Sequence, residues 1–115
     1  MGFAVHENDK VEREERFPIN ADVRLVDDAQ NHAELTVIDL SRSGIGIDGL
    51  IHFPAETRVR VDFPNGQVRT GVTRWRDTFT SGVSFDVPMT DSHLCGLWLA
   101  LRNNPHFDPK VKFAS

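Results

Sequence analysis

Hydrophobic and polar residues alternate through most of residues 17–86. A period of two is typical of half-buried β-strands, because successive side chains of a strand point to opposite faces. The predicted strands cover about residues 21–25, 33–40, 45–50, 59–63, 68–76 and 82–86. Six short strands without helices between them favour an antiparallel barrel or sandwich over a parallel sheet.

Short polar stretches separate these predicted strands. Asn65-Gly66 is the clearest turn, because this dipeptide tolerates the positive φ angles that β-hairpins need. Residues 77–80, with the sequence Asp-Thr-Phe-Thr, are expected to turn the chain again before the last strand.

The period changes after residue 90. An apolar stripe with the i, i+3, i+4, i+7 spacing of an amphipathic helix is formed by Leu94, Leu97, Trp98 and Leu101. Thr90 or Asp91 is a suitable N-cap, and Asn-Asn-Pro at 103–105 ends the helix. We expect this helix to lie across an open end or edge of the barrel and to bury Trp98.

Composition places the chain among ordinary globular proteins. With 115 residues, 39% hydrophobic and 26% charged, it has the size of one domain. We expect a flexible tail at 1–9, a domain at 10–104 and an irregular tail at 105–115. The polar N-terminus is unlike a signal peptide, no run of about 20 apolar residues predicts membrane insertion, and one cysteine fits a reducing cytoplasm. A net charge of −4 argues against a general nucleic-acid partner.

The histidines, Ser41 and Cys95 are the candidates for metal binding and nucleophilic catalysis. The five histidines are scattered, and none forms the H-x-x-x-H or C-x-x-C pairs typical of metal sites. Ser41 lacks the G-x-S-x-G elbow of a hydrolase, and Cys95 falls on the predicted core helix, where a small buried thiol is expected. We therefore predict neither an enzyme nor a metal or cofactor.

A polar turn and a basic arm remain. Residues 39–44, Asp-Leu-Ser-Arg-Ser-Gly, end one predicted strand and open the next. Asp39 can accept from N–H groups, Ser41 can donate or accept, and Gly44 allows a backbone or ligand to come close. The charged segment at 10–16 carries arginines, which grip phosphates or the O6/N7 edge of guanine. Arm and turn together suit a guanine nucleotide with phosphates.

The order and spacing of these residues resemble the PilZ domain family, which combines an R-x-x-x-R arm with a [D/N]-x-S-x-x-G motif. Asp39, Ser41 and Gly44 match the second motif in full, and Arg16, followed by Phe-Pro-Ile, matches the second arginine of the first. The sequences Val-Thr-Arg-Trp at 72–75 and Gly-Val-Ser-Phe at 82–85 resemble the family's closing strands. The resemblance covers about residues 10–100.

This resemblance implies a fold and a function. The fold is all-β, a six-stranded antiparallel barrel with one C-terminal amphipathic helix. The function is that of a bacterial effector that binds cyclic di-GMP, whereupon the arm becomes ordered and a new surface meets a protein partner. The ligand-binding residues are Arg13, Arg16, Asp39, Ser41 and Gly44, with Arg42 as a possible substitute.

One position departs from the family pattern. Glu12 stands where the first motif arginine is expected, and the nearest arginine is Arg13, which gives R-x-x-R. Two hypotheses therefore stay open: a cyclic di-GMP receptor in which Arg13 compensates, and a protein-interaction adaptor that binds the nucleotide weakly or not at all. A third and more distant hypothesis is a small barrel that binds single-stranded nucleic acid, with aromatic side chains as a stacking platform. Most of these aromatics, however, fall at inward-alternating or helix-stripe positions, which favours a role in the core.

Overall fold

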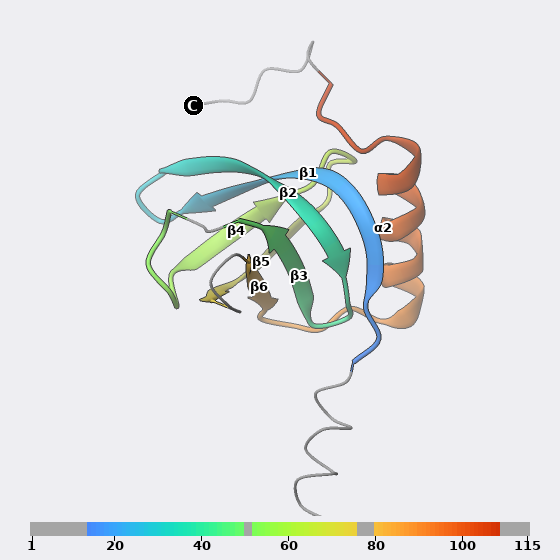
Figure 1. Ribbon diagram of the computed structural model, residues 1–115, viewed down its shortest axis with the longest axis horizontal. Coiled ribbons are helices and arrows are strands. Elements are labelled where there is room, and N and C mark those ends of the chain that lie inside the picture. Colours follow the sequence, from blue (N-terminus) through green and yellow to red (C-terminus); the bar gives the residue numbers. More distant parts are fainter. Residues whose placement is uncertain (1–13, 50–51, 76–79, 109–115) are drawn as a thin grey trace, which may run out of the picture.

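The computed structural model (Figure 1) describes residues 14–49, 52–75 and 80–108. Within them the chain forms six strands and one helix, and the strands close an antiparallel barrel in the order β1-β2-β3-β6-β5-β4. The elements are β1 (Phe17–Asp27), β2 (His32–Leu40), β3 (Gly44–Asp48), β4 (Arg58–Asp62), β5 (Val68–Trp75), β6 (Thr80–Phe85) and α2 (Asp91–Asn103). The predicted barrel with one C-terminal helix is thus confirmed, and the sandwich alternative is wrong.

Strand β1 closes the barrel because it pairs on both sides. Its first half lies against β2, with Pro18 opposite Asp39, and its second half lies against β4, with Leu25 opposite Val61. A register shift in the β1–β2 pairing between Pro18 and Ala21 bends the strand. At 11 residues β1 is longer than the predicted strand at 21–25, since Pro18 and its neighbours lack the alternating pattern but still pair.

Inward-facing residues of β1, β2, β3, β4 and β6 make one hydrophobic core. Residues that alternate in the sequence, such as Val23 and Leu25 or Val59 and Val61, are buried as predicted. The Asn65-Gly66 turn also forms as predicted between β4 and β5, with Gly66 at a φ of 92°. Thr80, predicted to lie in a turn, instead begins β6, where it pairs with Asp48. The rest of this predicted turn, residues 77–79, lies outside the described part of the chain.

Helix α2 begins and ends where the sequence indicates. The hydroxyl of Thr90 accepts from the backbone N–H of His93 at 3.1 Å, and the N–H of Asn104 donates to Ala100. Its buried face, consisting of Leu94, Leu97 and Leu101, joins the barrel core. The helix packs against β1 (Figure 1). Because the barrel is closed, it has no open sheet edge, so of the two expected positions for the helix the edge is wrong.

Two expectations for this helix need correction. Trp98 is only partly buried, and its indole Nε1 donates to the carbonyl oxygen of Pro18 at 2.9 Å. Cys95 is exposed, because it lies off the stripe that faces the core. No helix among the described residues is long and apolar enough to cross a membrane.

The start of the predicted C-terminal tail packs on β1. The carbonyl oxygen of Pro105 accepts from the backbone N–H of Asp22 at 2.7 Å, and His106 Nδ1 lies 3.1 Å from a carboxylate oxygen of Asp22. Phe107 lies 6.0 Å below the guanidinium of Arg24. Residues 105–108 therefore form an irregular strap across the barrel wall.

Candidate functional site

The turn at residues 39–44 joins β2 to β3 and is held together by its own hydrogen bonds. The backbone N–H and the hydroxyl of Ser41 both donate to the carbonyl oxygen of Gly44, at 2.9 and 3.3 Å. Ser41 has no exposed surface. In this structure its side chain therefore fixes the shape of the turn rather than facing solvent.

Gly44 is required by the packing of two strands. A Cβ at this position would lie 2.2 Å from the carbonyl oxygen of Val83 on β6, which is a backbone atom. Because backbone cannot move aside as a long side chain can, no larger residue fits without a shift of the strand. The close approach anticipated at Gly44 is thus made by a neighbouring strand.

Arg16 and Asp39 form an ion pair at the entrance to the turn. Arg16 Nη1 lies 2.9 Å from Asp39 Oδ1, and the two side chains are 41% and 20% exposed. They meet because β1 pairs with β2, and Pro18, two residues after Arg16, lies opposite Asp39. The structure thus brings the second arginine of the arm onto the acid of the turn, while Arg13 and Glu12 lie outside the described residues.

Glu14 is attached to the same turn. Its carboxylate accepts from the backbone N–H of Ser43 at 3.2 Å and also from the Ser43 hydroxyl. Burial raises the pKa of Glu14, but hydrogen bonds from the hydroxyls of Ser43 and Ser41 outweigh this and leave the pKa below its ordinary value of 4.5. No pattern in the sequence indicates this contact, since charged runs are usually solvated.

A hollow of about 210 Å³ lies beside the turn, and two arginines share it. Arg16 and Arg74 line it from different parts of the barrel, over a floor made by Ser43, Gly44, Gly82, Val83 and Ser84. Arg74 lies on β5 opposite Gly82 of β6, and its Nη1 is 3.3 Å from an oxygen of Glu56. Arg74 is not among the ligand-binding residues predicted from the sequence, although it lies in the stretch 72–75, Val-Thr-Arg-Trp, which resembles one of the family's closing strands.

Arg42 faces a different part of the surface. Its Nε donates to the carbonyl oxygen of Met89 at 3.1 Å and lies 3.7 Å from Asp91 at the start of α2. It borders an apolar groove of about 440 Å³ between the arm and α2, lined by Glu14, Glu15, Phe17, Arg42, Asp91, Leu94, Cys95 and Trp98. The predicted residues Arg16, Asp39, Ser41 and Gly44 therefore lie together, and Arg42 points away from the hollow that Arg16 and Arg74 share.

This arrangement can hold an anion and a hydrogen-bond donor side by side. Two guanidinium groups suit phosphate oxygens, since each offers a planar fork of N–H donors. A carboxylate next to them accepts from N–H groups such as those of a purine base. Among residues 14–49, 52–75 and 80–108, no three histidine, cysteine or acidic side chains come together as metal ligands.

Comparison with protein families agrees with this geometry. The family model described as PilZ domain matches residues 10–96, which include all six strands, the turn and the first part of α2. The curated proteins searched gave no match. PilZ domains are ligand-binding effector domains and are not a known family of enzymes. Because the match covers well over half of its length, the chain belongs to the PilZ domain family.

Proposed function

We propose that this protein is a cyclic di-GMP receptor that acts as an effector. The observation that carries the proposal is the shared hollow of Arg16 and Arg74 beside a complete D-x-S-x-x-G turn. A cyclic dinucleotide has two phosphates and two guanines, so it needs cationic forks and a carboxylate within reach of one another. In this proposal Arg16 and Arg74 bind phosphate oxygens, while Asp39 accepts from guanine N–H groups.

The remaining residues have assigned roles in the same proposal. Ser41 keeps the turn in its binding shape, and Gly44 lets β6 approach so that the floor of the hollow stays shallow. Arg13 supplies a second arginine from the arm, whereas Arg42 takes no ligand contact, because it is bonded to Met89 and points away from the hollow. Arg74 also compensates for Glu12, because it places a second guanidinium beside Arg16 without help from the arm.

Ligand binding in this proposal exchanges contacts that already exist. Arg16 is paired with Asp39, and Glu14 occupies the donors of Ser43. An exposed ion pair contributes only about 0–1 kcal/mol, so a doubly charged ligand can displace it. The arm segment at 14–16 is thus redirected by the ligand rather than ordered for the first time. That change of position supplies the signal read by a protein partner.

A second candidate is an adaptor that works without nucleotide. It is favoured by the same two contacts, since Arg16 and Ser43 find partners inside the chain. Glu12 and Glu14 would also repel phosphates near the arm. In this case the turn only holds the arm in place, and the protein binds its partner in one conformation without a nucleotide.

Isothermal titration with cyclic di-GMP separates the two candidates. The receptor predicts saturable heat, and it predicts a loss of about tenfold or more in affinity for Arg16→Ala and for Asp39→Ala. Arg60→Ala is a matched control, because Arg60 and Asp62 form a similar exposed pair at 2.8 Å on β4 away from the hollow. No heat with the wild-type protein at high micromolar ligand would leave the adaptor as the function.

A further inference from the structure

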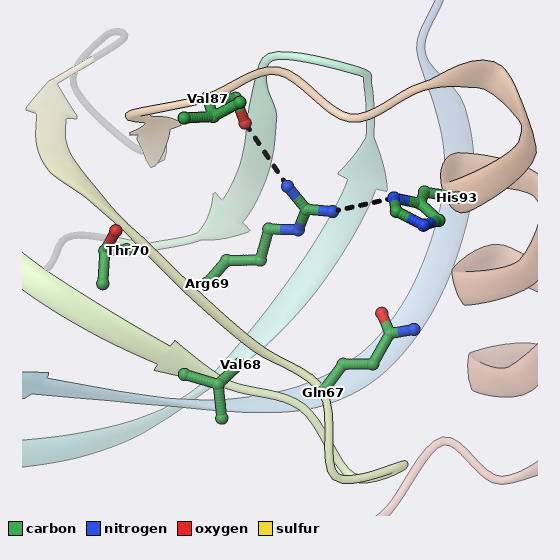
Figure 2. A pocket seen from close by; sticks show the side chains of 6 residues that line it. All are labelled: Gln67, Val68, Arg69, Thr70, Val87 and His93. Atoms are coloured by element: carbon green, nitrogen blue, oxygen red, sulfur yellow. Dashed lines mark hydrogen bonds between the residues drawn. The ribbon is translucent and has the colours of Figure 1, made fainter.

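A second hollow, of about 320 Å³, is lined by the start of β5, the β6–α2 connection and the first turn of α2, and it combines apolar and cationic groups. Figure 2 shows its lining residues, which are Gln67, Val68, Arg69, Thr70, Val87 and His93. Val68 is 54% and Val87 is 68% exposed. The described residues contain three large hydrophobic side chains with such exposure, and two of them border this hollow, which we call the Arg69 hollow.

Among the described residues, no carboxylate is paired with Arg69, which lines this hollow. Its guanidinium donates to the carbonyl oxygen of Val87 at 3.3 Å and lies 3.4 Å from His93 Nδ1 (Figure 2), and it sits 5.8 Å from the ring centre of Phe85. Within the described part of the chain, six other arginines each contact an acid, namely Arg16, Arg24, Arg42, Arg58, Arg60 and Arg74. Arg69 is therefore a positioned cation whose neighbours are a carbonyl oxygen, an imidazole nitrogen and an aromatic ring.

We propose that the Arg69 hollow binds a segment of a partner protein in which an aspartate or glutamate stands next to an aliphatic residue. The acid complements the guanidinium, which offers two parallel donors to a carboxylate. The aliphatic residue covers Val68 and Val87, whose burial favours binding. Arginine beside apolar surface is typical of the residues that carry the energy of an interface. Because the barrel is closed, the partner binds through side chains and does not add a strand to an edge.

The hollow is physically connected to the D-x-S-x-x-G turn. The backbone N–H of Met89 donates to the carbonyl oxygen of Arg42 at 2.7 Å, and Arg42 Nε donates back to Met89 at 3.1 Å. The N–H of Phe85 donates to the carbonyl oxygen of Ser43 at 2.8 Å. Val87 lies between these two attachment points, so a displacement of the turn moves one wall of the hollow. This coupling rests on the proposed function, whereas the binding surface itself does not.

An NMR titration tests the surface with a defined probe. The isotope-labelled protein is titrated with acetyl-Gly-Leu-Glu-Leu-Gly-amide and with the same peptide carrying Gln in place of Glu. The proposal predicts amide shifts centred on residues 67–70, 87 and 93, and an affinity for the Gln peptide at least about tenfold lower, as expected for loss of a charge-assisted contact.

Matched variants show whether Arg69 and Val87 are responsible. Arg69→Gln is compared with Arg102→Gln. Arg102 lies in the last turn of α2, far along the helix from His93, and its guanidinium is 4.7 Å from the centre of the Trp98 ring. Val87→Ser is compared with Leu99→Ser, since Leu99 is the third exposed hydrophobic residue, at 48%, and lies away from the hollow. We expect a loss of tenfold or more in peptide affinity for Arg69→Gln, a smaller loss for Val87→Ser, and no change for either control.

Several results would overturn this inference. They are equal affinity for the two peptides, shifts located elsewhere on the protein, or an equal effect of Arg69→Gln and Arg102→Gln. Shifts at these residues that depend on protein concentration without peptide would replace the partner segment by a second copy of the chain. Repeating the titration with cyclic di-GMP tests the coupling separately. Peptide binding without any cyclic di-GMP binding would keep the surface and reject the receptor.

Discussion

The carboxylate of Glu14 accepts hydrogen bonds from both the backbone N–H and the hydroxyl of Ser43, inside the D-x-S-x-x-G turn. A carboxylate of the chain thus occupies donors that lie beside the hollow shared by Arg16 and Arg74. In a receptor for a phosphate-containing ligand, such an internal acid competes with the incoming negative charge. The arm therefore carries a carboxylate that competes with the phosphates of the ligand that the arm is proposed to bind.

Removal of this charge should favour the ligand. Glu14→Gln keeps an acceptor for Ser43 but replaces a charge-assisted hydrogen bond with a neutral one, a difference of about 1 kcal/mol. We expect cyclic di-GMP to bind several-fold more tightly, and hydrogen exchange of residues 14–16 to become faster without ligand. Glu15→Gln is the matched control, since Glu15 is exposed and makes no such contact with the turn. An equal gain in cyclic di-GMP affinity from both variants would mean that the change in net charge, and not the contact with Ser43, is responsible.

The arm contact should depend on pH in the acid range. The pKa of Glu14 lies below 4.5, since the hydrogen bonds from Ser43 and Ser41 outweigh the opposing effect of burial. A lowered pKa in the folded protein means that the stabilisation is fully present above the ordinary pKa and is lost as pH falls through the lowered value. We expect the Ser43 amide shift to be constant above about pH 5 and to change only at pH values below 4.5. In Glu14→Gln this change should disappear.

Two glycines should respond in opposite ways to a methyl group. Gly44→Ala places a Cβ against the backbone of Val83, so we expect the free energy of unfolding to fall by about 1–3 kcal/mol. Gly96→Ala meets no atom within 4 Å on the exposed side of α2, so a gain of about 0.5–1 kcal/mol is expected from helix propensity. Denaturant titration of both variants measures the difference. Similar effects of the two would contradict the close approach at Gly44.

Restoring the first motif arginine tests the geometry of the arm. Glu12→Arg adds a cation and removes an acid, so we expect tighter cyclic di-GMP binding, by roughly ten- to a hundred-fold for one charge-assisted contact. Titration calorimetry measures the gain. Glu15→Arg makes the same charge change three residues later and should have a much smaller effect. Unchanged affinity in Glu12→Arg would mean that Arg13 already fills this role or that the arm binds differently.

Arg74 is expected to act with Arg16 although it lies far from it in the sequence. Arg74→Gln should weaken cyclic di-GMP binding by about tenfold or more, since one phosphate contact is lost. The free energy of unfolding should change little, because the pair with Glu56 is exposed, at 48% and 74%, and such pairs contribute about 0–1 kcal/mol. Arg60→Gln serves as the control. Equal affinity of Arg74→Gln and the wild type would remove Arg74 from the site.

Short stretches of sequence determine much of the local structure. Alternation at residues such as Val59 and Val61 predicts which side chains are buried, since a strand exposes every second side chain to the same face. Thr90 and the Asn65-Gly66 turn are equally local, because a cap or a tight turn depends on only a few neighbouring residues. The motif of Asp39, Ser41 and Gly44 is also local, and its order and spacing with Arg16 and the Gly-Val-Ser-Phe ending at 82–85 indicate the family.

The site itself depends on contacts between distant residues. Glu14 reaches Ser43 across 29 positions, and Arg74 reaches the hollow of Arg16 only because β5 pairs with β6 and β6 with β3. Neither contact leaves a periodic pattern, since a charged side chain on an outer face looks the same whether solvent or another residue lies opposite. Strand periodicity, caps and turns thus follow from the sequence, because they rest on nearest neighbours. Closure of the barrel by β1 and β4, and with it the choice of which charges meet, is decided by the tertiary fold.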